Sequence, residues 1–182
     1  MKTKKGFTLM EMIISMAVLV IMSTALAGAF SSGFSTFGSS RELQRNLENA
    51  QYALNTIEKF LRTSTVLSGD GTAGNPLVFY EYSSGRCFRY RINAGSLEAG
   101  WYPSPNPSNP PVCASGSFPA YSSVTTGHVA GGFSVVQSSP STTPKRMGRV
   151  TVNLSVKESA TATMESRIQA TASLRDYSYV GF

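Results

Sequence analysis

One acidic side chain lies where an acid is costly. Glu11 stands at the head of an apolar run, and between Met12 and Phe30 only Ser15, Ser23 and Thr24 are polar. A carboxylate inside such a run costs about 2.5–3.5 kcal/mol on membrane-insertion scales, and less near the membrane edge. An acid at this position therefore needs a reason, because an unpaired charge in low-dielectric surroundings is expensive.

The two cysteines are a second candidate pair. Cys87 and Cys113 both lie in the C-terminal half, with no histidine or third cysteine at metal-ligand spacing. If that half lies outside the cytosol, we expect a disulfide, worth roughly 3–4 kcal/mol through loop closure. Two free thiols are the alternative.

Two groups of basic residues could contact phosphate. In the run Arg86–Ile92, an extended strand would place Arg89 and Arg91 on one face and the apolar side chains on the other. A solvated face over a buried face is the preferred interpretation, and salt-sensitive contact with DNA is the alternative. The candidate DNA-contact residues are Arg86, Arg89, Arg91, Lys145, Arg146 and Arg149.

No pattern predicts an enzyme or a cofactor. His128, the only histidine, lies in a Gly-, Ser- and Thr-rich stretch that we expect to be a surface loop. Asp70-Gly71-Thr72 with Asn75 offers oxygen atoms to calcium, but Ca²⁺ takes six to eight oxygens and one carboxylate is a poor start. A turn is therefore the preferred interpretation of this segment, and a calcium site is the alternative.

The apolar run predicts a membrane anchor. Nineteen residues from Met12 to Phe30 make a helix about 28 Å long, close to the thickness of a bilayer core. Lys2, Lys4 and Lys5 precede the run without an acid, which favours a cytoplasmic N-terminus and an external C-terminal part. The run is longer than the apolar region of an ordinary secretory signal.

The segment Lys4-Lys5-Gly6-Phe7-Thr8-Leu9-Met10-Glu11 resembles the processing site of type IV pilins and type II secretion pseudopilins. In that family a membrane aspartyl peptidase cuts after the glycine and methylates the new N-terminal amine. The resemblance implies a cleaved leader over residues 1–6, an N-methylated Phe7, and a Glu11 that neutralises the terminal amine of a neighbouring subunit. A plain single-pass anchor in which these residues occur by accident is the alternative.

The resemblance also implies a structural role and a set of partners. We expect a single-pass inner-membrane protein that enters a pilus or pseudopilus with other pilin or pseudopilin subunits. A prepilin peptidase, an inner-membrane platform and an assembly ATPase would act on it. The final segments, Arg149–Val156 and Glu165–Asp176, resemble the last hairpin of larger minor pilins and J-type pseudopilins. A minor pilin, at the tip or in priming, is therefore preferred over a secretion pseudopilin or a DNA-uptake subunit.

Beyond the anchor, apolar residues recur at helical spacing. The stripe predicts an amphipathic helix over residues 39–66. Either Ser39 or Ser40 caps its start, or it joins the transmembrane half (7–31) in one helix over 7–66. Three glycines between the halves either weaken the helix or allow close packing of helices. The stripe consists of Leu43, Leu47, Ala50, Leu54, Ile57 and Leu61, and the glycines are Gly28, Gly33 and Gly38.

The remaining residues, 67–182, predict a β-rich head. The 182-residue chain suffices for one domain, and its sparse charge, 14% of residues, with abundant Ser, Thr and Gly favours strands and loops over a helical bundle. A Pro- and Ser-rich loop is expected over 102–117. The fold class is thus α+β: a long N-terminal helix packed on an antiparallel sheet, as the resemblance to pilins also implies. Strands are predicted at Leu77–Tyr82, Arg86–Ile92, Gly132–Gln137, Arg149–Val156 and Met164–Leu174.

Overall fold

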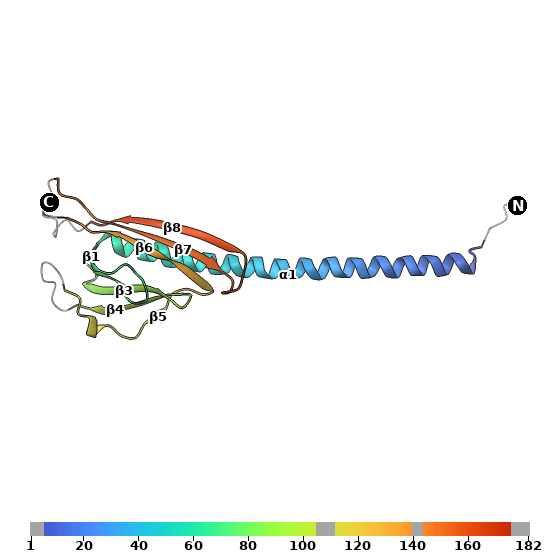
Figure 1. Ribbon diagram of the computed structural model, residues 1–182, viewed down its shortest axis with the longest axis horizontal. Helices are drawn as coiled ribbons and strands as arrows, with labels where there is room; N and C mark the ends of the chain where they lie inside the picture. Colours follow the sequence, from blue (N-terminus) through green and yellow to red (C-terminus); the bar gives the residue numbers. More distant parts are fainter. Residues whose placement is uncertain (1–5, 105–111, 140–143, 176–182) are drawn as a thin grey trace. The chain divides into compact units, whose positions relative to one another are not determined.

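The computed structural model describes residues 6–104, 112–139 and 144–175 (Figure 1). The leader lysines Lys2, Lys4 and Lys5 lie outside these ranges. The chain divides into two compact units, residues 1–41 and 42–182. Among the described residues, the first unit contains helix and the short segment before it, and the second contains the strands.

One α-helix, α1, runs from Leu9 to Arg62. It is helical through Ser39 and Ser40, so the helix does not restart at either serine. In the first unit its apolar side chains are exposed, whereas in the second unit the predicted stripe is buried or half-buried. The helix ends four residues before the predicted boundary at 66, because the following residues form a strand. The fully buried members of the stripe are Ala50, Leu54, Ile57 and Leu61.

The first sheet is antiparallel and has five strands in the order β1-β2-β3-β4-β5. A two-residue turn joins β3 to β4, and both of its residues, Ala94 and Gly95, have positive φ. This conformation matches the twist of a tight hairpin. The strands are β1 (Ser64–Ser68), β2 (Leu77–Glu81), β3 (Arg86–Asn93), β4 (Ser96–Pro103) and β5 (Ser122–Ser123).

The second sheet has three antiparallel strands in the order β6-β7-β8. Its strands are β6 (His128–Val136), β7 (Arg149–Lys157) and β8 (Glu165–Ser173). The alternation predicted for β7 is confirmed, since Val150, Val152, Leu154 and Val156 are all buried. The other face of the sheet carries polar side chains.

The head has one core that joins the helix to both sheets. Leu54, Ile57 and Leu61 of α1 share a cluster with side chains from β2, β3, β6 and β7. A row of stacked aromatic rings runs through it, with centroid distances of 4.7 Å from Phe60 to Phe88 and 5.4 Å from Phe88 to Phe79. The predicted α+β architecture of a helix on antiparallel sheet is therefore confirmed.

Several details differ from the sequence prediction. The strands form two sheets rather than one, and β1, β4 and β5 were not predicted. The expected loop 102–117 begins inside β4, where Pro103 stands opposite Arg86 at the strand end and needs no further ladder bond. Residues Ser115–Ser117 form a short 3₁₀ helix, η1. His128 is the first residue of β6 rather than part of a loop.

Candidate functional site

Two side chains, those of Thr8 and Glu11, cap the start of α1, because each accepts a hydrogen bond from the other residue's backbone N–H. Thr8, the residue before the helix, donates its backbone N–H to Glu11 Oε2 at 2.9 Å, and its hydroxyl lies 3.1 Å from the same oxygen. In return, the Glu11 N–H donates to Thr8 Oγ1 at 3.3 Å. Because Glu11 is the third helical residue, this is a capping box, which satisfies backbone donors that a helix start leaves without partners.

The cap fixes where the helix begins relative to the predicted cleavage site. Gly6 and Phe7 precede Thr8, are not helical, and are exposed, with Phe7 at 88%. Exposed irregular backbone is the preferred substrate of proteolysis, since the chain must be accessible to enter a protease. The bond from Gly6 to Phe7 is therefore accessible, and Glu11 lies within one helical turn of Leu9, the first helical residue.

Sequence reasoning singled out Glu11 but missed Thr8. The spacing Thr8-x-x-Glu11 is the capping-box pattern, and it stood in the sequence as a readable signal. Both bonds to the carboxylate use Oε2, so Oε1 can accept a further hydrogen bond.

In the apolar segment of α1, the few polar side chains donate hydrogen bonds to backbone carbonyl groups of the same helix. Ser23 donates its hydroxyl to the Leu19 carbonyl at 2.7 Å, and Thr24 donates to that of Val20 at 3.1 Å. Ser15 likewise donates to the Glu11 carbonyl. Side chains that bond within the helix are compatible with lipid, where polar groups must be satisfied internally. Among the described residues, α1 is the one helix long and apolar enough to cross a membrane.

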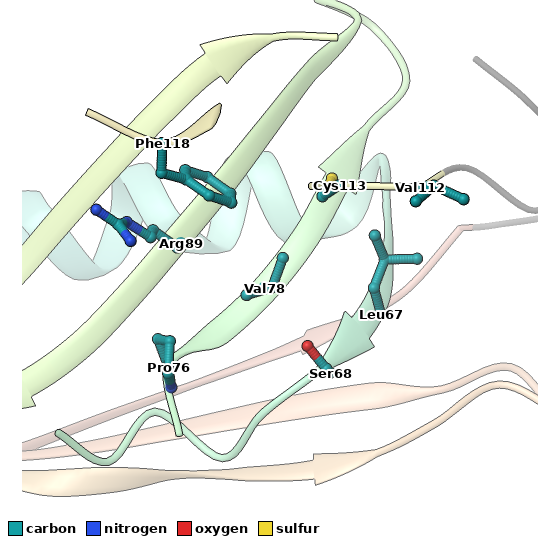
Figure 2. A pocket seen from close by; sticks show the side chains of 8 residues that line it. All are labelled: Leu67, Ser68, Pro76, Val78, Arg89, Val112, Cys113 and Phe118. Carbon is teal, nitrogen blue, oxygen red and sulfur yellow. The ribbon is translucent and has the colours of Figure 1, made fainter. Parts of the chain in front are cut away.

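In the head, Cys87 of β3 forms a disulfide with Cys113, with the two Cα atoms 5.8 Å apart. The bond holds the segment 112–121 across the outer face of the first sheet. A cavity of about 250 Å³ lies beneath this segment. Figure 2 shows Arg89 and Phe118 at one side of the cavity and Leu67 and Val112 at the other. The lining is mostly apolar, so the cavity is a packing gap beside the disulfide rather than an arrangement of reactive groups.

The arginines of β3 hold the same segment by stacking. Arg89 lies over the ring of Tyr121, 3.8 Å from its centroid, and donates to the Pro119 carbonyl. Arg91 lies 3.7 Å from the same centroid and donates to Glu98 at 2.6 Å. Contacts of this kind bind a guanidinium to the protein surface. Arg89 and Arg91 therefore attach residues 112–121 to the first sheet.

The remaining basic candidates lie elsewhere. Arg86 stacks on Trp101, with its guanidinium carbon 4.3 Å from the ring centroid. Lys145, Arg146 and Arg149 lie at or just before the start of β7, in the second sheet, and all three are exposed. The structure thus distributes the two basic groups over different sheets, and it does not assemble a single basic strip from them.

The calcium candidate is a hydrogen-bonded turn. Asp70 accepts from the Thr72 N–H at 3.0 Å, and the N–H groups of Asp70 and Gly71 both donate to the Asn75 carbonyl. The bond from Thr72 holds the pKa of the Asp70 carboxyl below its usual value. Within the described ranges, no three His, Cys, Asp or Glu side chains gather in one place.

Comparison with known proteins matches only the N-terminus. Residues 1–27 match the family model described as the prokaryotic N-terminal methylation motif. No curated protein and no solved structure matches the chain. Families with this pilin-type motif are structural rather than enzymatic. The motif, followed by the long apolar helix that Glu11 and Thr8 cap, therefore fits a type IV pilin-like protein.

Proposed function

We propose that the chain is a minor subunit, at the tip or in priming, of a type IV pilus or a related filament. A prepilin peptidase removes residues 1–6, and the mature subunit begins at N-methylated Phe7. The capped start of α1 carries this proposal, because it leaves the Gly6–Phe7 bond outside the helix and sets Glu11 one turn away. The match of the methylation motif to residues 1–27 supports the same processing.

Assembly follows from the electrostatics of the new N-terminus. Cleavage creates an ammonium group at Phe7 beside a long apolar helix, where an unpaired charge is costly. The Glu11 carboxylate of a neighbouring subunit offers the matching charge, with Oε1 available for the bond. A pair formed between subunits would favour correct register in the filament. The inner-membrane platform and its ATPase would then extract the subunit from the cytoplasmic membrane, with its head outside the cytoplasm.

Two related roles remain as alternatives. A J-like pseudopilin of type II secretion is supported by the β7–β8 hairpin near the end of the described chain. A DNA-uptake subunit would need basic groups that face outward. Of the six candidates, Arg89 and Arg91 are held by internal contacts, so this role depends on Arg86, Lys145, Arg146 and Arg149.

Processing is tested by mass analysis of protein produced with and without a prepilin peptidase. We expect peptidase-dependent loss of residues 1–6 and, where the methylase is active, a gain of about 14 Da at Phe7. Gly6→Val should block the cut, whereas Gly28→Val should leave it unchanged. A cut after the apolar run, or an intact Met1 with active peptidase, would refute the proposal.

Assembly is tested separately with Glu11→Ala, in cells that process the chain. We expect normal membrane insertion and cleavage but loss of the subunit from sheared filaments. Ser15→Ala, one turn further along α1, serves as the matched control because it removes a polar group without removing charge. A Glu11→Ala subunit that enters filaments at the normal level would support a passive anchor instead.

A further inference from the structure

The outer face of the second sheet is a polar surface that the filament role does not use. Side chains alternate across a sheet, so the burial of Val152 and Leu154 places their β7 neighbours on the opposite face. We call this surface the hydroxyl-amide face. It comprises Ala130, Gly132 and Ser134 of β6, Thr151, Asn153 and Ser155 of β7, and Arg167, Gln169 and Thr171 of β8.

A groove crosses this face from strand to strand. Gly131, Leu154 and Ile168 stand opposite one another in register. The Leu154 and Ile168 side chains point to the other face, so the backbone of the three residues forms the floor. The walls come from the rows on either side: Asn153 with Gln169, and Ser155 with Arg167 and Glu165. The groove encloses about 470 Å³, within the range of roughly 300–1,000 Å³ that is typical of small-ligand sites.

The groove persists because β6 contributes almost no bulk. Its outward positions beside the groove are Ala130 and Gly132, opposite the longer side chains of Ser155 and Asn153. At Gly131 φ is +142°, and a Cβ there would come within 2.0 Å of the Asn153 carbonyl oxygen. The close approach of β6 and β7 at this point therefore depends on glycine.

The walls of the groove have the chemistry of polyol recognition. The amides of Asn153 and Gln169 each present a donor and an acceptor, and both side chains are exposed. A hydroxyl pair continues the pattern along the strands, with Thr151 Oγ1 and Thr171 Oγ1 3.1 Å apart. Neighbouring hydroxyl groups of a sugar can donate to and accept from such side chains at once.

The positive charge around the hydroxyl-amide face favours sugars that carry a negative charge. Glu165 accepts from Arg167 Nε at 2.6 Å and lies 3.6 Å from Lys157 Nζ. Hydrogen bonds from Arg167 and Ser155 hold the pKa of Glu165 below its usual value, so it is ionised at neutral pH. On this side of the sheet, around the hydroxyl-amide face, Arg149, Lys157 and Arg167 outnumber Glu165 by two positive charges. The Arg167 side chain is 84% exposed, which leaves its guanidinium open to a further carboxylate.

We propose that the hydroxyl-amide face binds an acidic oligosaccharide, with a sugar carboxylate at Arg167 and sugar hydroxyls at Asn153 and Gln169. The acid pairs with the guanidinium through two N–H donors, and the amides hold the hydroxyls of the same ring. The hydroxyl row of Thr151 and Thr171 receives the next sugar along the strands. The ligand class is a polymer of uronic acids.

Single-stranded nucleic acid shares the negative charge but fits the face less well. Sequence-tolerant binding of single strands uses aromatic side chains on which bases stack. The nine positions of the hydroxyl-amide face, all within the described residues, include no Phe, Tyr or Trp. Protein partners also prefer aromatic anchors at the centre of an interface. The face therefore lacks the aromatic anchors on which both of these partner classes rely.

Binding is tested by calorimetry with the full-length protein in detergent micelles and hexagalacturonate as the probe. The same hexamer with methyl-esterified carboxyls keeps the hydroxyls but removes the charge. We expect Arg167→Gln and the esterified probe each to weaken binding up to about fivefold, the range for a solvent-exposed charge pair. Gln169→Ala should weaken it several-fold, and Arg146→Gln, a charge-matched control off this face, should change it less than about twofold.

Absence of saturable binding at millimolar hexagalacturonate would overturn the proposal, as would equal affinity for the esterified hexamer. Equal weakening by Arg146→Gln would show that general charge, not the groove, attracts the probe. Tighter binding of oligothymidine with the same dependence on Arg167 would assign the face to nucleic acid instead. Because unassembled subunits are measured, failure here leaves the filament proposal intact.

Discussion

The buried carboxylate of Glu81 leads to a specific prediction about the free energy of unfolding. It lies at the end of β2, only 1% exposed. Thr63 donates its hydroxyl to it at 2.6 Å, and the backbone N–H groups of Ser83 and Ser84 each donate at 2.9 Å. The hydroxyls of both serines donate as well. The carboxylate thus joins the residue after α1 to the turn between β2 and β3.

These bonds decide the charge state of Glu81. Burial alone would raise its pKa, but the hydrogen bonds from Ser83, Ser84 and Thr63 outweigh burial and lower the pKa from 4.5 to about 2. A pKa that is lower in the folded state stabilises the fold above the unfolded value. The difference corresponds to about 3 kcal/mol, fully present above pH ~4.5 and lost as the pH falls through about 2.

Glu81→Gln removes the charge and places an amide donor among five donors. We expect the free energy of unfolding at pH 7 to fall by about 3 kcal/mol, since a charged hydrogen-bond acceptor is lost inside the head. Urea unfolding of the full-length protein in micelles, followed by the fluorescence of Trp101, measures it. The wild-type advantage should shrink as the pH is lowered from 5 to 2.5. The reasoning is refuted if the two proteins differ equally at pH 3 and pH 7.

Three further changes test other parts of the structure. Replacing Cys87 and Cys113 by serine should lower the free energy of unfolding by about 3.5 kcal/mol, the loop-closure value for a 26-residue separation; a loss below 1 kcal/mol in urea would contradict it. Thr8→Ala should reduce hydrogen-exchange protection in the first turn of α1 by about 1 kcal/mol, whereas Thr8→Ser should retain it. Gly131→Ala should destabilise the head by more than about 1 kcal/mol in thermal unfolding, because its Cβ would meet a β7 carbonyl. Gly132→Ala, with open space around it, should have little effect.

Periodicity predicted the parts of the fold that local pattern controls. The β7 alternation and the stripe of α1 report burial directly, because one face of each meets the core. Two of the strands that the sequence did not predict, β1 and β4, have features that do not suggest a strand. Ser64–Ser68 continues the helical sequence without a breaker, and β4 contains Gly100 and Pro103, which usually argue against a strand. β1 pairs with β2 across the loop of residues 69–76, and β4 pairs with β3 across a two-residue turn, so both strands are defined by pairing and not by their own composition.

The N-terminal motif is readable from the sequence because its residues are adjacent in the chain. Gly6, Phe7 and Glu11 lie within one short motif, and the spacing of Thr8 to Glu11 needs no tertiary structure to form a cap. Glu81 had no comparable signal. Its three partners are serines and a threonine of common type, and only the meeting of α1 with the β2–β3 turn makes the carboxylate an acceptor of five bonds.

The alternation of β3 explains why its arginines were assigned to a solvated face. A strand pattern distinguishes the core side from the other side, but it does not reveal whether a later segment covers that other side. Here Cys113 and Tyr121 bring residues 112–121 across it, so Arg89 and Arg91 face their own chain. The hydroxyl-amide face of the second sheet carries no such cover among the described residues. Recognition of a ligand by the head is therefore expected on the sheet whose outer side chains are still exposed.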